Sequence, residues 1–154
     1  MPNPDKFEVV KIPGLKETDK GLAFLRCDTR NDINAKTEFD RLKEKKKNDV
    51  RNRFDYWLNG FHFDRYFHGF PGHPQWHELY IFKWQQGRVQ HRLYGFLLKP
   101  RLPDGFQVCI LVCYGSKPGG DHHDPAKLAL AEALRLNIDV TKEVKRVFLK
   151  PKTR

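Results

Sequence analysis

The alternation of apolar and polar positions is clearest in the middle of the chain, where it predicts a β-hairpin. Residues 76–84 alternate, the chain turns at residues 85–87, and residues 88–99 continue as a second strand. Because the turn is short, we expect the two strands to pair antiparallel. Chemistry-bearing side chains on this hairpin would then lie close together.

The hairpin is followed by a second turn and a run with almost no polar residue. The turn falls at residues 102–105, and residues 106–114 are apolar nearly throughout. Such a run is typical of a strand that is buried on both faces, so we expect it at the centre of the sheet. A glycine-rich loop over residues 115–124 leads to a helix that begins at Pro125.

The first half of the chain predicts a short strand and then helix. Residues 7–12 resemble a strand, whereas residues 15–30 show no clear period. Apolar positions at helical spacing extend from Asn31 or Asp32 to residue 58, but KEKKKND in the middle has no apolar residue. The segment is therefore one long helix with a solvated middle or two helices that meet near residues 48–49. We favour a helical hairpin or a bent helix, because a free-standing lysine-rich helix gains little from packing.

The connector after this helical region is rich in aromatic residues, glycine and proline. Its aromatic set consists of Phe61, Phe63, Tyr66, Phe67 and Phe70. The set has two interpretations, a hydrophobic lid on the sheet or a platform on which nucleobases stack. We favour the lid.

Composition indicates one domain with an affinity for polyanions. The 154 residues are 39% hydrophobic and 13% aromatic, which suffices for a single core. Lysine and arginine number 29 against 19 acidic residues, a net charge of +10. Such a balance attracts nucleic acid, although the excess of lysine also has a simpler interpretation as a source of solubility.

The cysteines and the absence of long apolar stretches predict a cytoplasmic protein. The three cysteines are an odd number without C-x-x-C spacing, which disfavours disulfides and zinc knuckles. Cys109 and Cys113 are expected about 13 Å apart along one strand, too far for a bridge. No stretch reaches the roughly 20 apolar residues of a membrane span, and the N-terminus lacks the pattern of a signal peptide.

The hairpin and the central strand carry side chains suited to handling an RNA phosphate without a metal ion. Cleavage by the 2′-hydroxyl needs a base, an acid and cations that stabilise the charge on phosphorus. Arg92 and Lys117 are our candidates for the catalytic cations, because a guanidinium grips two phosphate oxygens and a lysine contributes a point charge. Lys83, Arg88 and Tyr114 are candidates for RNA contacts.

Each candidate also has a structural interpretation. Arg92 pairs with Glu78 across the hairpin in the alternative view, and we weigh the two roles evenly. Lys117 is otherwise a solvated loop lysine. Tyr114 is otherwise a buried ring with its hydroxyl at the rim, and His91 fits the edge of the core better than a catalytic role.

His122 and His123 lie between two aspartates in GGDHHDP. The pattern does not support a metal site there, because adjacent histidines lack the helical spacing of zinc ligands and no third ligand is positioned by the sequence. Beside Lys117, the two imidazoles are instead candidates for acid or base near neutral pH. We therefore expect no metal and no cofactor.

Four segments together resemble the RelE/HigB toxin superfamily, in particular its phage-derived HigB-like branch. They are Trp76-His77-Glu78-Leu79, Arg92-Leu93-Tyr94, the strand end from Leu111 to Lys117, and the helix opening after Asp124-Pro125. The resemblance covers about residues 34–136, leaving residues 1–33 as an N-terminal extension and residues 137–154 as a basic tail. Tyr80 and the stretch Gly115 to Pro118 depart from the family pattern.

The resemblance implies both a fold and a function. The fold is α+β, with N-terminal helices packed on a small, mainly antiparallel twisted sheet and a C-terminal helix. The function is that of a ribosome-associated, metal-independent mRNA endoribonuclease, a type II toxin held inactive by a cognate antitoxin, with Arg92 at the phosphate. The departures at Gly115 to Pro118 favour an alternative: a catalytically weak or inactive RNA- or protein-binding module of the same fold.

Overall fold

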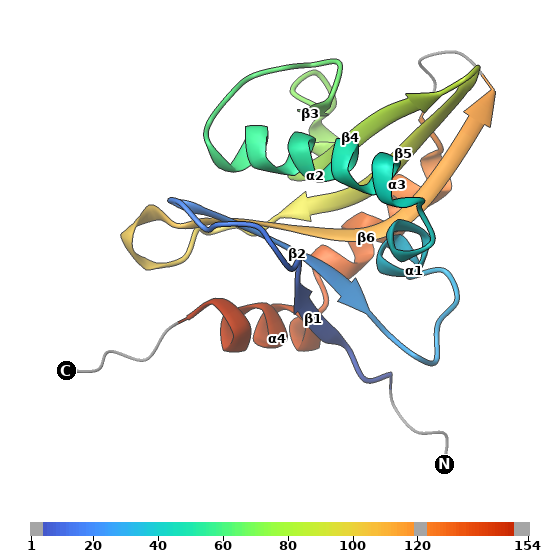
Figure 1. Ribbon diagram of the computed structural model, residues 1–154. Coiled ribbons are helices and arrows are strands. Elements are labelled where there is room, and N and C mark those ends of the chain that lie inside the picture. The colour runs from blue at the N-terminus through green and yellow to red at the C-terminus, as the bar shows by residue number, and fades with distance from the viewer. Residues whose placement is uncertain (1–4, 119–122, 150–154) are drawn as a thin grey trace.

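The computed structural model describes residues 5–118 and 123–149, with the backbone alone at residues 117 and 118. Within these residues, six strands form one sheet (Figure 1). In spatial order they are β1 (Glu8–Lys11), β2 (Lys20–Arg26), β6 (Gln107–Pro118), β5 (Val89–Leu97), β4 (Leu79–Gln86) and β3 (Phe67–Gly69). The long strand β6 lies between β2 and β5, so the apolar run is central as predicted.

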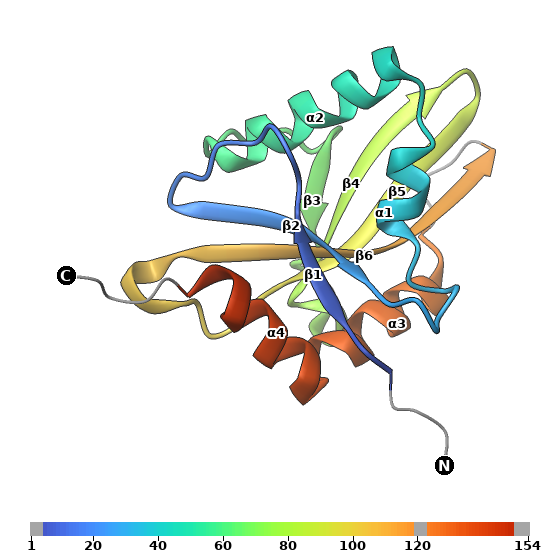
Figure 2. The ribbon, with the colours of Figure 1, turned by 60° about the horizontal axis from the view of Figure 1, so that its bottom comes forward.

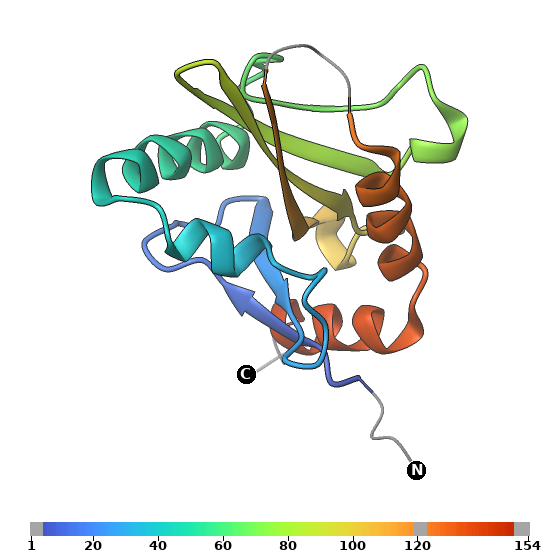
Figure 3. The ribbon, with the colours of Figure 1, turned by 90° about the vertical axis from the view of Figure 1, so that its right-hand side faces the viewer.

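Helices cover both faces of this sheet (Figures 2 and 3). In the described part of the chain they are α1 (Ala35–Asp40), α2 (Glu44–Leu58), α3 (Pro125–Arg135) and α4 (Ile138–Phe148), with short 3-10 turns η1 (Pro74–Trp76) and η2 (Pro103–Gly105). The break between α1 and α2 falls at residues 41–43, not near residues 48–49 as expected. The lysine run therefore lies inside α2, whose packing rests on Val50, Phe54, Trp57 and Leu58.

The predicted fold, with N-terminal helices on a small and mainly antiparallel sheet, was wrong. The sheet is mixed, because β2 pairs with β6 in parallel, with Lys20 opposite Gln107. Five consecutive residues of β2 are buried, so its sequence shows no alternation that would mark a strand. Strands β1 and β2 thus come from the segment expected to extend the domain, and α4 comes from the expected tail.

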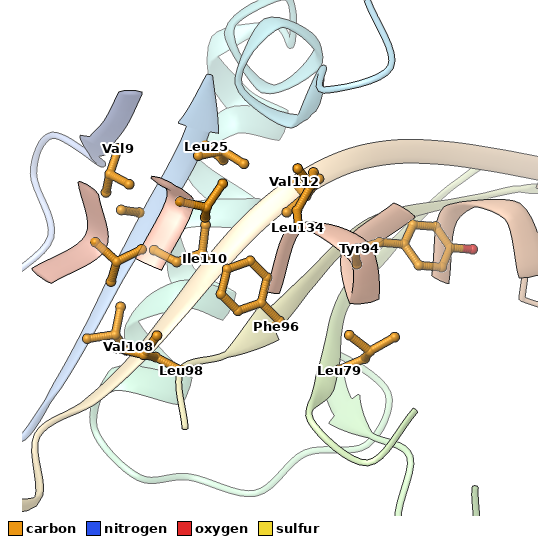
Figure 4. Packing of buried hydrophobic residues seen from close by; sticks show 14 of the residues in the cluster. Val9, Leu25, Leu79, Tyr94, Phe96, Leu98, Val108, Ile110, Val112 and Leu134 are labelled. Atoms are coloured by element: carbon orange, nitrogen blue, oxygen red, sulfur yellow. The ribbon is translucent and has the colours of Figure 1, made fainter. Parts of the chain in front are cut away.

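Two cores form, one on each face of the sheet. Strand β6 contributes alternate residues to them: Val108 and Ile110 face α3 and α4, whereas Cys109 and Leu111 face α1 and α2. Figure 4 shows the first of these cores, where Ile110 lies beside Phe96 and Leu134 approaches from α3. The three cysteines are buried free thiols, and burial raises the pKa of Cys113 to about 12.

A β-bulge interrupts the alternation of β6. Tyr94 pairs with Cys113 and Gly95 with Leu111, which leaves Val112 as the extra residue. Val112 and Cys113 therefore both face α3, and Tyr114 turns to the α1 and α2 face.

Among the helices of the described ranges, none is both long and apolar enough to cross a bilayer.

Gly95 is required by this bulge. A Cβ at this position would lie 2.0 Å from the backbone oxygen of Ile110, and backbone cannot move aside as a flexible side chain does. We expect Gly95→Ala to lower the free energy of unfolding by about 3 kcal/mol, the upper part of the range for overpacking. Urea unfolding measures the loss. Gly72→Ala is the control, because a Cβ there meets no atom within 4 Å; equal stability of both variants would contradict the prediction.

Candidate functional site

A cavity of about 1050 Å³ opens at the β3 end of the sheet. Strand β3 pairs with β4 only from Tyr80 to Phe82, so residues 62–66 cover the rest of that edge without forming a strand. The charged side chains of the described cavity lining are Arg53, Arg65, Lys83, Arg92 and Asp64. Four cations against one carboxylate make the cavity suited to an anion.

The register of the β4–β5 hairpin places Lys83 opposite Arg92. The turn consists of Gly87 and Arg88, with Gly87 at a φ of 63°, a conformation that glycine adopts readily. Glu78 precedes β4, and its backbone carbonyl accepts a hydrogen bond from the N–H of Leu97, five residues along β5 from Arg92. The alternative interpretation of Arg92, a cross-hairpin pair with Glu78, is therefore wrong.

Arg92 is nearly buried, with 2% of its surface exposed, and it lines the floor of the cavity. Arg53 reaches the same region from α2. Its Nε donates a hydrogen bond of 2.9 Å to the carbonyl of Lys83, and its guanidinium lies 3.8 Å from the ring centre of Tyr66. The backbone N–H of Lys83 in turn donates to the carbonyl of Tyr66 at 2.7 Å. These contacts tie α2, β4 and residues 62–66 together around the cationic groups.

His68 joins these cations, and sequence reasoning missed it. It lies on β3 opposite Ile81, and its Nδ1 donates to the carbonyl of Gly69 at 2.7 Å. In a neutral ring this tautomer leaves the lone pair on Nε2. Burial lowers the pKa of His68, and the nearby cations Lys83 and Arg92 lower it further, against the opposing effects of the Gly69 hydrogen bond and Asp64. Its imidazole is therefore neutral at physiological pH.

His123 brings a second imidazole to the cavity from the start of α3. Its ring centre lies 5.5 Å from that of His68 and 5.1 Å from that of Phe70. The next residue, Asp124, caps α3 and donates its backbone N–H to the Tyr94 hydroxyl at 3.2 Å. The predicted partner residue His122 lies outside the described residues. Across the described ranges, no group of three His, Cys, Asp or Glu side chains is arranged to hold a metal ion.

Of the remaining predicted residues, Arg88 and Tyr114 do not line the cavity. Arg88 is exposed in the hairpin turn and does not line the cavity. Lys117, described by its backbone, pairs with Gln90, a residue of the cavity lining. Tyr114 lies on the opposite face, where its hydroxyl is 2.5 Å from Nδ1 of His91 and His91 stacks on Trp84. His91 is half-buried there, as its interpretation as a core-edge histidine predicts.

Comparisons with protein-family models, with curated protein sequences and with solved structures found no match. The function is therefore argued from the cavity. Of the candidates predicted from the sequence, the fold brings Arg92, Lys83 and His123 together in its lining.

The lowered pKa of His68 predicts a dependence of stability on pH. Below a pH of about 6.5 the unfolded chain binds a proton at this histidine more readily than the folded chain does, so stability is present above that pH and is lost as pH falls. The free energy of unfolding should therefore fall less between pH 7 and pH 5 in His68→Asn, which keeps a hydrogen-bond donor for the Gly69 carbonyl, than in the wild type. Urea titrations at the two pH values measure this difference. His91, whose pKa is also lowered by burial, leaves a residual slope.

The control is His77→Asn at an exposed position. A pH profile that is unchanged in His68→Asn, or changed equally in the control, would contradict the assignment of this slope to His68.

Proposed function

We propose that this protein binds single RNA strands and cleaves them by attack of the 2′-hydroxyl on phosphorus, without a metal ion. The observation that carries the proposal is the meeting of Arg92 and Lys83 with two imidazoles, His68 and His123, in one cationic cavity. A phosphodiester carries the negative charge that these groups match. The imidazoles supply acid and base near neutral pH.

The proposed roles follow from the protonation of each group. Neutral His68 takes the proton of the 2′-hydroxyl on Nε2 as that oxygen bonds to phosphorus. Arg92 and Lys83 stabilise the negative charge that grows on the phosphorane oxygens. His123, in its protonated form, gives a proton to the departing 5′-oxygen, so the products are a 2′,3′-cyclic phosphate and a 5′-hydroxyl. Lys117 and His122, the other two catalytic candidates, remain part of the proposal.

The resemblance to the toxins extends this proposal to its biological partners. We propose mRNA on the ribosome as the substrate, a cognate acidic antitoxin as the inhibitor, and the cytoplasm as the compartment. The net charge of +10 supports both polyanionic partners, because the same cations serve each of them. The free cysteines support a reducing compartment.

The departure from the toxin pattern at Gly115 to Pro118 favours a second candidate, an RNA- or protein-binding module without catalysis. Arg92, which is 2% exposed, would serve such a module by holding a ligand in the cavity. Binding without cleavage by the purified protein would select this candidate.

Cleavage of an end-labelled single-stranded RNA, with and without translating ribosomes, tests the enzyme proposal. We expect cyclic phosphate ends and unchanged cleavage in the presence of a chelator. Arg92→Lys, which keeps the charge but loses the guanidinium fork, and Lys83→Ala should each lower the rate by about 100- to 1000-fold. His68→Asn and His123→Ala should lower it by about 100- to 10,000-fold.

Lys142→Ala is the charge-matched control, because it removes one exposed cation on α4, away from the cavity lining. Thermal melting of each variant separates lost chemistry from lost folding. Cleavage that needs a divalent cation, or that survives all four substitutions, would overturn the mechanism.

RNA binding should weaken as salt rises, because bound phosphates release their counterions. Each phosphate contact on a single strand contributes roughly −0.7 to the slope of the logarithm of the association constant against the logarithm of the salt concentration. Four contacts from the cavity cations therefore predict a slope of about −3. Fluorescence anisotropy with a non-cleavable 2′-O-methyl strand measures this slope. Lys83→Ala should reduce its magnitude by about 0.7, whereas Lys142→Ala should not. An affinity that does not change with salt would contradict the prediction, and the basic charge would then serve only solubility.

A further inference from the structure

An exposed group of aromatic rings lies beside the cationic cavity. Tyr56, Phe61 and Phe63 are 43%, 58% and 43% exposed, which is costly for rings of this size. The lid interpretation therefore holds for Phe67 and Phe70, which are buried, and for Tyr66, which packs half-buried against the core, but not for Phe61 and Phe63. Exposed apolar groups gathered in one place mark interaction sites more often than scattered ones do.

The rings form an ordered platform, which we define as Tyr56, Phe61, Phe63 and Tyr66. Tyr66 stacks on Phe63, with ring centres 4.4 Å apart and planes 15° apart, and it is nearly parallel to Tyr56 at 5.9 Å. Phe61 meets Tyr56 edge-on at 5.7 Å. Arg53 lies over Tyr66 and is held by the Lys83 carbonyl. Through Arg53, the Tyr66 ring is therefore connected to the backbone of Lys83, one of the cavity cations.

The platform and the cavity are continuous. Phe63 and Tyr66 line the cavity themselves, and Arg65 between them in sequence lines it too. Rings and cations in such proximity match a ligand with alternating flat apolar groups and negative charges. A nucleic-acid strand with unpaired bases has this pattern, whereas a duplex keeps its bases inside the helix.

We infer that the platform stacks the bases of a single-stranded nucleic acid next to the phosphate held in the cavity. The inference rests on the proposed function and deepens it by restricting the substrate to unpaired segments. Charge complementarity decides the occupant, because four cations line the cavity that Phe63 and Tyr66 also line, and the carboxylate of Asp64 alone opposes them among the described lining residues. A hydrophobic protein segment would match the rings but not these charges.

Binding of fluorescent 2′-O-methyl oligonucleotides tests the inference without any dependence on cleavage. The probes are a single strand of twelve nucleotides, the matching duplex, and a strand of equal length with abasic sites in place of its bases. We expect the single strand to bind most tightly. Phe63→Ala should weaken it about 5- to 150-fold, as expected for the loss of one stacked base, and should leave the abasic strand unaffected.

Two further variants separate stacking from general apolar contact. Phe63→Trp should retain single-strand affinity, because it keeps an aromatic face. Leu136→Ala removes an apolar side chain that is 66% exposed at the end of α3, and it should change nothing. Melting curves are expected to be similar for all three, because each position is exposed.

The outcomes distinguish this inference from the proposed function. Equal affinity of wild type and Phe63→Ala for the single strand, with the salt slope intact, overturns the platform and leaves the cavity proposal standing. Preference for the duplex also overturns the platform. Absence of oligonucleotide binding at low salt overturns both. An acidic peptide that binds through Phe63, while the oligonucleotide does not, assigns the rings to a protein partner and overturns the inference.

Discussion

The burial of β6 on both faces is the constraint on which the structure depends. This strand pairs with β2 on one side and with β5 on the other, while its side chains enter both cores. Its bulge then exchanges the two faces, so Tyr114 leaves the α3 side and Gly115 takes the position opposite Arg92. A Cβ at Gly115 would lie 2.8 Å from Cε of Lys127, so the missing side chain makes room for a lysine from α3. The surroundings of Arg92 are therefore a product of the bulge.

The local sequence pattern predicted the elements near β6, but it missed the strand whose partner lies far along the chain. The hairpin, β6 and α3 were predictable, because alternation, an apolar run and a proline at the first helical position are local signals. Strand β2 was missed, because an apolar run as short as Leu22 to Leu25 does not by itself distinguish a buried strand from a helix. Without β2 the sheet appeared small and antiparallel, which explains the error in the fold.

Errors of register account for the misplaced site contacts. A three-residue turn at residues 85–87 would bring Glu78 towards Arg92, but the two-residue turn at Gly87 and Arg88 brings Lys83 there instead. Tyr114 lies on the face opposite Arg92, because the bulge reverses its direction. His68 escaped notice because its place depends on a three-residue strand pairing with β4, and no pattern marks so short a strand.

The parallel pair of β2 and β6 also determines the order in which the chain can fold during its synthesis. Lys20 and its partner Gln107 are 107 − 20 = 87 residues apart. At about 5 to 20 residues per second, a newly made β2 waits roughly 4 to 17 s before its partner strand exists. During this interval its apolar residues have only β1 as a strand neighbour, and one edge of β2 remains open to other chains. Translation speed between these strands thus governs how long each nascent molecule is exposed to aggregation.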